Sequence, residues 1–231
     1  MRIKNVLVTG GAGYVGAVLV PQLIKKGYEV KVLDWFLYGE DVFEIYKDNR
    51  KLIQIKGDLR DKKTVMKALV GTEAVIHLAC ISNDPSFDLD PSLGKSVNYE
   101  STLFLADESK RAGVKRFIYA SSSSVYGIKK EAKVSEVLKL EPLTDYSKYK
   151  AICEKYILEK AAHHGNAYQR WPARIRIVPA HHEKRAGDIA GAGGGELLFG
   201  APKIPPSESP LSSLVADSSL QRGQEFYRFA G

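Results

Sequence analysis

Two side chains four residues apart, Tyr146 and Lys150, could together carry out acid–base chemistry. On a helix, residues at this spacing lie on the same face, one turn from each other. A tyrosine phenol with its ordinary pKa of about 10 is a poor base at neutral pH. A neighbouring ammonium stabilises the phenolate and lowers the phenol pKa, so Tyr146 could take a proton from a substrate hydroxyl.

The same spacing occurs again ten residues further along the chain, at Tyr156 and Lys160. The spacing alone therefore does not identify a site, because tyrosine and lysine are also common on solvated helix faces. We interpret this second copy as a polar stripe on a helix surface and the first as the candidate site. The choice between them depends on the segments expected to surround each pair.

A glycine-rich segment, T-G-G-A-G-Y-V-G at residues 9–16, lies between an expected strand and an expected helix. Gly10, Gly13 and Gly16 would permit a tight turn, close approach of the backbone to a pyrophosphate and close packing of helix on strand. The helix N-terminus would present free N–H groups and the positive end of its dipole to the phosphates. Glycine-rich turns are common, so the alternative is a purely structural strand-to-helix turn.

Asp34 ends the second expected strand, about twenty residues beyond the glycine turn. A carboxylate at this place would accept hydrogen bonds from the ribose hydroxyls of an adenosine dinucleotide. The next residues are Trp35 and Phe36, neither of which can bind a 2′-phosphate. The segment therefore favours NAD over NADP, with a capping aspartate as the alternative interpretation.

Two further strand ends could border the same ligand. Asp58, within G-D-L-R-D at residues 57–61, could accept a hydrogen bond from the adenine amino group or simply cap a helix. Leu78 and Ala79 would let a cofactor lie against the backbone at the carboxyl end of a strand, where open α/β sheets bind ligands. We interpret the preceding His77 as a packed strand residue rather than a catalyst.

A run of four serines at residues 121–124 ends another expected strand and precedes Tyr146. Such a run can be no more than a polar strand end. At the carboxyl edge of a parallel sheet, however, it would lie beside a bound ligand. The residues alone leave both interpretations open.

Strand and helix signals alternate over the first 160 residues. Apolar, β-branched runs typical of buried strands occur at residues 3–9, 29–34, 52–56, 74–78 and 116–121. Helical patterns occur after Gly13 and at residues 62–69, 91–112 and 145–160. This order predicts an α/β fold with a doubly wound parallel sheet of the Rossmann type. The apolar stripe that we expect the first helix to turn toward the sheet consists of Val15, Val18, Leu19 and Leu23.

The composition changes after about residue 160. Up to Lys160 lysines outnumber arginines 21 to 5, whereas the counts afterwards are 2 and 6. Glycine and proline become dense, and only residues 174–178 still resemble a strand. We therefore divide the chain into a dinucleotide-binding domain at residues 1–165 and an atypical, loop-rich remnant at residues 166–231. We expect this remnant to be truncated or out of frame.

The bulk composition excludes several classes of protein. It is 44% hydrophobic and 26% charged, which is ordinary for a soluble globular protein. Cys80 and Cys153 lie far apart without metal-ligand spacing, so no metal is expected. Neither a membrane span nor a secretory signal is apparent, so a cytoplasmic location without membrane partners is expected. The net charge of +7 comes from scattered lysines, which suits a small anionic ligand better than nucleic acid.

Taken together, these segments resemble the extended short-chain dehydrogenase/reductase family, in its NAD-dependent epimerase/dehydratase branch. The matching pieces occur in the family's order: T-G-G-A-G-Y-V-G at 9–16, Asp34, G-D-L-R-D at 57–61, H-L-A at 77–79, Asn98, S-S-S-S-V-Y-G at 121–127 and Y-S-K-Y-K at 146–150. The chain departs from the pattern after the catalytic helix. Family members there show a strand ending in Arg-Pro, where this chain has R-I-R-I-V-P at 174–179.

The resemblance implies roles for the matching positions. Tyr146 would be the proton-transferring base, and Lys150 would hold the nicotinamide ribose and tune Tyr146. Ser122 stands at the family's catalytic serine or threonine, four residues before the Tyr of V-Y-G. The family spacing also selects Tyr146 over Tyr156. The residues expected to bind the cofactor, NAD, are Gly10, Gly13, Tyr14, Val15, Gly16, Asp34, Asp58, Leu59, Leu78, Ala79 and Lys150.

The resemblance further implies epimerisation of a nucleotide sugar, as in UDP-glucose 4-epimerase-like enzymes, through a transient 4-keto sugar and reversible hydride transfer. Family dehydratases carry Asp-Glu where Ser123 and Ser124 stand, so dehydration is disfavoured. Two alternatives stay open: an NAD-dependent dehydrogenase or reductase of another alcohol or ketone, and an NAD-binding protein without turnover. Family members often form homodimers through the helices that correspond to residues 91–112 and 145–160, so a homodimer is expected.

Overall fold

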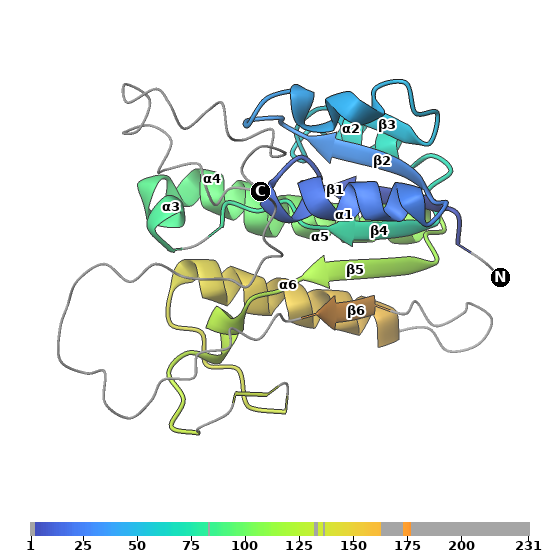
Figure 1. The fold of residues 1–231 in the computed structure, drawn as a ribbon. Helices are drawn as coiled ribbons and strands as arrows, with labels where there is room; N and C mark the ends of the chain where they lie inside the picture. The colour runs from blue at the N-terminus through green and yellow to red at the C-terminus, as the bar shows by residue number, and fades with distance from the viewer. Residues whose placement is uncertain (1–2, 83, 132–133, 136, 163–172, 177–231) are drawn as a thin grey trace, which may run out of the picture.

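A six-stranded parallel sheet forms the centre of the molecule (Figure 1). The computed structural model describes residues 3–82, 84–131, 134–135, 137–162 and 173–176. Across the sheet the strands run in the order β3 (Leu52–Lys56), β2 (Glu29–Asp34), β1 (Asn5–Thr9), β4 (Ala74–His77), β5 (Arg116–Ala120) and β6 (Ala173–Arg176). The chain thus builds outward from β1 on one side and then returns to its other side. Open parallel sheets bind ligands at such a reversal, beyond the carboxyl ends of the strands.

The helices form layers on both faces of the sheet (Figure 1). On one face lies α1 (Tyr14–Lys25), followed along the chain by a short 3₁₀ helix, η1 (Asp41–Tyr46). On the other face α2 (Lys62–Leu69) contacts α5 (Ser101–Arg111), which in turn contacts α6 (Asp145–Ala162). The short helices α3 (Asp84–Leu89) and α4 (Pro91–Lys95) and the 3₁₀ helix η3 (Ser123–Tyr126) follow β4 and β5 near the carboxyl edge. The doubly wound α/β prediction is confirmed.

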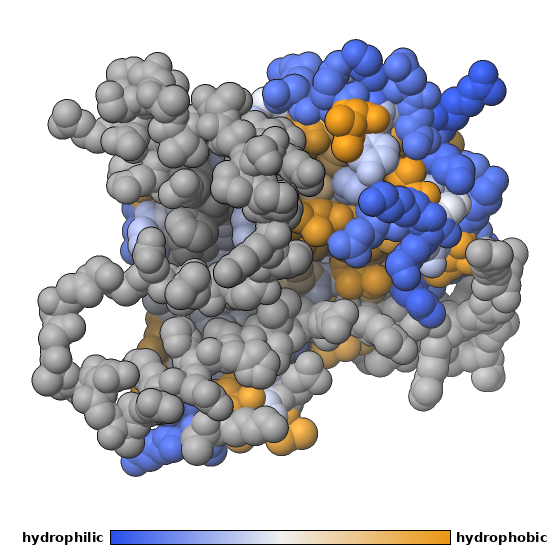
Figure 2. Space-filling model, in the orientation of Figure 1, coloured by the Kyte–Doolittle hydropathy of each residue, from blue (hydrophilic) through white to orange (hydrophobic). Residues whose placement is uncertain are grey.

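Alternation along the strands produces two separate cores. On β1, Val6 and Val8 pack with α1 and η1 through residues such as Val20 and Phe43. Leu7 points to the opposite face, where it joins the cluster formed by α2, α5 and α6. Because helices cover both faces of the sheet centre, β1 and β4 are buried almost throughout, as strands inside a parallel sheet require, whereas the edge strand β3 is only partly buried. Outside these cores the surface mixes hydrophobic and hydrophilic residues (Figure 2).

The expected apolar stripe of α1 faces the core only in part, since Leu23 packs against the core on this side of the sheet. Val15 and Val18 are each 53% exposed, whereas the buried positions are Gly16, Val20 and Ile24. The helix lies so close to the glycine turn that a Cβ built on Gly16 would come 2.2 Å from the carbonyl oxygen of Gly11. The smallest residue therefore faces inward at the start of the helix, and counting large apolar residues was wrong for Val15 and Val18.

The helix expected at residues 91–112 forms as one run that contains a π turn. Between α4 and α5 the segment η2 (Ser96–Glu100) widens to π geometry. Its Asn98 is buried, and its side chain both accepts a hydrogen bond from the Ile81 backbone N–H (2.7 Å) and donates one to the Ile81 carbonyl (2.8 Å). Single π turns occur often at functional sites, because they re-aim a side chain. Here the turn fixes the segment that leaves β4.

Within the second expected domain, residues 173–176 form β6, which pairs in parallel with β5. This agrees with the strand expected from residue 174 onward, whose last residues lie outside the described part of the chain. The division at residue 165 remains a prediction, as does the truncated or out-of-frame origin of residues 166–231. Among the described residues, no helix combines the length and the apolar character needed to cross a membrane.

Candidate functional site

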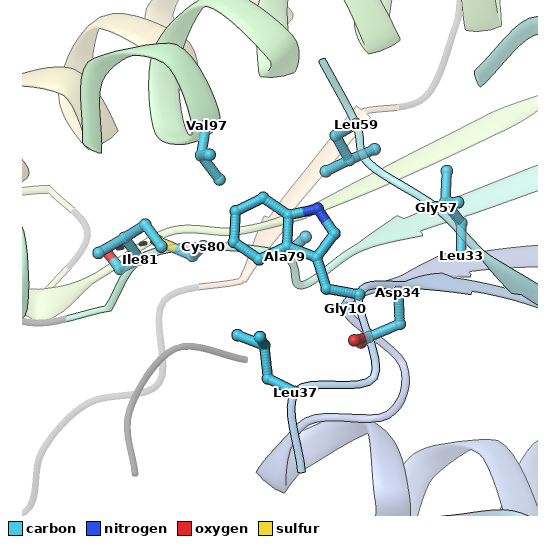
Figure 3. Close-up of a pocket in the computed structure, with 11 residues that line it drawn as sticks. Gly10, Leu33, Asp34, Leu37, Gly57, Leu59, Ala79, Cys80, Ile81 and Val97 are labelled. Atoms are coloured by element: carbon cyan, nitrogen blue, oxygen red, sulfur yellow. Dashed lines mark hydrogen bonds between the residues drawn. The ribbon is translucent and has the colours of Figure 1, made fainter. Parts of the chain in front are cut away.

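A cleft opens at the point where the strand order reverses, between the ends of β1 and β4. It holds about 430 Å³ of empty space, which includes space open to solvent. Figure 3 shows side chains from β2, from the segments after β3 and β4 and from the π turn around one common space. The lining residues are Gly10, Leu33, Asp34, Trp35, Leu37, Gly57, Leu59, Ala79, Cys80, Ile81 and Val97.

The glycine turn can form only with residues that lack a side chain at key places. Gly10 has a φ of +69°, a conformation that favours glycine, and its N–H donates to the Leu33 carbonyl at 2.9 Å. A Cβ on Gly10 would lie 2.4 Å from the backbone nitrogen of Ala79. The turn therefore brings β1, β2 and the end of β4 together at the floor of the cleft.

The N-terminus of α1 follows this turn. Gly13 is its N-cap residue, and no side chain caps the helix there. The first N–H groups of an α-helix have no partner inside the helix, and the helix dipole favours an anion beside them. Tyr14 and Val15, which begin the helix, are exposed. The turn thus fits a phosphate-bearing ligand, and the roles of Gly13, Tyr14, Val15 and Gly16 in binding it remain predictions.

Asp34 lies where the sequence placed it, at the end of β2 and at the rim of the cleft (Figure 3). One carboxylate oxygen accepts a hydrogen bond from the Ala12 N–H (2.9 Å) and the other from the Phe36 N–H (2.7 Å). A carboxylate has about four acceptor positions, so these two bonds orient Asp34 and leave acceptor capacity for ribose hydroxyls. The carboxylate also ties the glycine turn to β2.

The segment after β3 contributes two expected residues in different ways. Leu59 is buried and lines the cleft, while Asp58 holds the Arg60 guanidinium in a fork of hydrogen bonds of 2.6 to 3.1 Å. Partial burial raises the pKa of Asp58, but hydrogen bonds from Arg60 outweigh this effect and lower it. At the end of β4, Ala79 lines the cleft and Leu78 packs against the core on the α1 side.

Tyr146 and Lys150 lie one turn apart on α6 and are almost fully buried, at 8% and 5% exposure. The Lys150 ammonium donates to the Ala120 carbonyl at the end of β5 (2.9 Å). It also lies over two rings, 4.9 Å from the centre of Tyr119 and 6.0 Å from that of Tyr146. Phe87 of α3 contacts Tyr146 edge to face. The cation is therefore held beside the phenol ring at the carboxyl edge of the sheet.

Ser122 follows β5 at the same edge. Its hydroxyl accepts a hydrogen bond from the Ser124 N–H (3.2 Å) and shares one with the Ser124 hydroxyl (2.8 Å), so it caps η3. The helix η3 packs against α6, which carries Tyr146. The serine cluster thus lies at the carboxyl edge of the sheet, where its cap geometry gives Ser122 a structural role, and its contact with a ligand remains a prediction.

His77 is a buried strand residue, as expected. Its ring is held between the hydroxyls of Thr9 (2.6 Å) and Thr102 (2.8 Å), and it stacks on Tyr119. Burial, with a smaller contribution from the Lys150 charge, lowers the pKa of His77 to about 3. The imidazole is consequently neutral at physiological pH and supports the ring that lies under Lys150.

Several features of the site could not be read from motifs. Val97, Ile81 and Leu37 line the cleft but belong to no recognisable motif. In the sequence, Asn98 is distinguished only by its match to the family pattern. Its two hydrogen bonds to the Ile81 backbone depend on the π turn. Within the ranges that the structure describes, no group of three or more His, Cys, Asp or Glu residues could hold a metal ion.

Known proteins share the sequence pattern and the fold. The model of the NAD dependent epimerase/dehydratase family matches residues 6–171. The chain belongs to the NAD dependent epimerase/dehydratase family. A UDP-glucose 4-epimerase of Rhizobium meliloti (strain 1021) is 29% identical over 167 residues, which are 71% of this chain and 49% of that protein.

Two solved structures of similar proteins carry ligands. A UDP-N-acetylglucosamine 4-epimerase from Methanobrevibacter ruminantium M1, in complex with UDP-N-acetylmuramic acid, has a TM-score of 0.66 at 30% identity; the match covers 76% of this chain and 54% of that one. The UDP-glucose 4-epimerase of Thermus thermophilus, in complex with NAD, has a TM-score of 0.61 at 30% identity over 68% of this chain and 51% of that one. The chain spans about half the length of these relatives.

Proposed function

We propose that the chain binds NAD in the cleft between β1 and β4 and provides the hydride-transfer half of a nucleotide-sugar epimerase similar to UDP-glucose 4-epimerase. One observation carries the proposal. Tyr146 and Lys150 are buried together at the same sheet edge that bears the uncapped helix N-terminus and Asp34. A dinucleotide with its pyrophosphate at the turn and its ribose at Asp34 would extend along this edge toward Lys150. Reversible hydride exchange with a sugar alcohol is the chemistry that such an arrangement serves.

The residues of the chain divide the work of proton transfer. Tyr146, as a phenolate stabilised by the Lys150 ammonium, would accept the proton of a sugar C4 hydroxyl. An ammonium has three donors, so the bond to Ala120 leaves Lys150 able to hold a ribose hydroxyl. The Ser122 hydroxyl would orient the same sugar oxygen. NAD would supply the reversible hydride acceptor for C4, and Tyr146 would give its proton back to the C4 oxygen when the hydride returns to the opposite face of the 4-keto sugar.

The proposed reaction regenerates its cofactor, and this distinguishes it from a dehydrogenase. The purified full chain, supplied with NAD, would be incubated with a panel of UDP-sugars; products would be followed by NMR and NADH by its absorbance. Formation of the C4 epimer without accumulation of NADH supports the proposal. Accumulation of one NADH per oxidised substrate would identify a net dehydrogenase instead. Cofactor binding without any change in the sugars would overturn the epimerase proposal in favour of a nucleotide-binding protein without turnover.

A further inference from the structure

Trp35 is an aromatic wall of the cleft that the proposed chemistry does not use. It directly follows Asp34 and lines the cleft together with Leu59, Ala79 and Val97. Figure 3 shows these last three side chains directed into the common space. The indole therefore borders the same volume as the residues nearest the expected adenosine end of the ligand.

The backbone on both sides of Trp35 is fixed. Phe36 has a φ of +57°, which side-chain-bearing residues rarely adopt and which costs on the order of 1 kcal/mol or more. It is kept there by burial, at 7% exposure, and by the hydrogen bond from its N–H to Asp34. Such conformations persist where the surroundings hold them, and they occur often at ligand sites. The strained residue anchors the chain so that Trp35 is presented at the cleft before any ligand arrives.

A guanidinium covers the Trp35 ring. The Arg60 guanidinium carbon lies 5.4 Å from the centre of the indole. Arg60 is itself held by Asp58 through three side-chain hydrogen bonds. The Trp35 side chain also acts as a hydrogen-bond donor toward Asp58, which adds to the lowering of the Asp58 pKa. The three side chains thus form one interlocked unit at the edge of the cleft.

From this geometry we infer that Trp35 is a specificity-determining residue that stacks on the adenine ring of the dinucleotide, with Arg60 and Asp58 holding the indole in place. The inference rests on the proposed binding of NAD in this cleft. A flat aromatic face attracts a base through stacking, which contributes about 1–3 kcal/mol per base in proteins. The Asp58 carboxylate also keeps Arg60 occupied, so Arg60 does not offer itself to a 2′-phosphate.

Binding measurements on the full chain test the inference. Calorimetric titrations with ADP, NAD and nicotinamide mononucleotide would compare the wild type with Trp35→Leu and Trp35→Phe. We expect Trp35→Leu to weaken ADP and NAD binding about 5- to 150-fold, the range that corresponds to the stacking energy. Trp35→Phe keeps a ring and should lose much less. Nicotinamide mononucleotide lacks adenine, so its affinity should not change.

Fluorescence provides a second readout that does not depend on the Leu variant folding. The chain has two tryptophans, Trp35 and Trp171, so in Trp171→Phe all tryptophan emission comes from Trp35. ADP should quench this emission, and nicotinamide mononucleotide should not. Unchanged or tighter ADP binding by Trp35→Leu, or emission that ADP does not alter, would overturn the inference alone. A wild-type chain that binds neither ADP nor NAD would overturn the proposed function as well.

Discussion

Helix α6 carries the same four-residue spacing twice, and the two copies lie in opposite environments. Tyr146 and Lys150 are buried where α6 crosses the end of β5, and Lys150 binds a backbone carbonyl there. Tyr156 and Lys160 lie at the contact between α6 and α5, half-exposed, and both bind Asp107. The comparison shows that the pattern specifies only a shared helix face. The partners supplied by the fold decide what the pair can do.

The partner of the second pair opposes catalysis. Burial raises the pKa of Tyr156, and the Asp107 carboxylate adds to this effect, so that the lowering by Lys160 is outweighed. Lys160 is in turn neutralised by Asp107 at 2.8 Å. A phenol held in its protonated form by a carboxylate is a poor base at neutral pH. The ammonium of the first pair instead lies over the rings of Tyr119 and Tyr146 and donates to a backbone carbonyl.

The largest expected effect separates the two tyrosines directly. Tyr146→Phe removes the proposed base and should reduce turnover of the UDP-sugar about 10²- to 10⁴-fold, while NAD affinity stays near the wild-type value. Tyr156→Phe is the matched control, because it makes the same change on the same helix, and should leave turnover unchanged. Steady-state kinetics and NAD titration measure both. Full turnover by Tyr146→Phe would contradict its assignment as the base. Loss of turnover in Tyr156→Phe would indicate that the second tyrosine takes part in the reaction.

The sheet and its cofactor turn could be predicted because local sequence determines them. The runs at β2 and β3 were predicted with the observed bounds, since their apolar and β-branched residues favour strands even though β3 lies at the sheet edge and is only partly buried. Gly10 and Asp34 were placed correctly for the same reason: the turn and the strand end are set by neighbours in the chain. When the neighbours along the chain determine the environment of a residue, its structural role can be predicted from the sequence.

Features that depend on the exact backbone geometry were missed or mistaken. The buried face of α1 is set by the close approach of Gly16 to Gly11, which a count of large apolar residues does not detect. The π turn at Asn98 forms to reach Ile81, seventeen positions earlier in the chain. Asp58 binds Arg60, two residues further on, and the helix cap that was its alternative interpretation is supplied by Asp61 instead. In each case the deciding contact depends on backbone and side-chain geometry that residue types and spacing do not specify.

The second expected effect is a loss of stability at low pH that is caused by His77, which stacks on the Tyr119 ring beneath Lys150. His77, stacked on Tyr119, has a pKa lowered to about 3, mainly by burial, whereas an unfolded histidine titrates near 6.5. Between these values the unfolded chain binds a proton that the folded chain does not, so stability falls as pH drops through this window. The loss should be about 2 kcal/mol at pH 5 relative to pH 7 and above.

Urea unfolding at both pH values measures this loss. His77→Gln retains hydrogen-bonding groups but cannot titrate, so its stability should decline less between pH 7 and pH 5. The histidines at 163, 164, 181 and 182 are common to both chains and cancel in the difference. Equal declines in the two proteins would show that His77 is not held neutral. The first tyrosine pair would then lack the buried support that distinguishes it from the second.

The smallest expected effect concerns the second pair. Tyr156→Phe loses the hydrogen bond to Asp107 and should lower the free energy of unfolding by about 0.5–1 kcal/mol. The low value follows from the partial exposure of Asp107 and Lys160, since exposed ion pairs contribute little. Asp107→Asn should cost a similar amount, and the double variant should lose less than the sum, because both changes remove the same contact. Additive losses in urea unfolding would contradict a shared bond. Tyr156 and Asp107 would then contribute to stability independently, and the hydrogen bond between α5 and α6 would not be the cause of the loss.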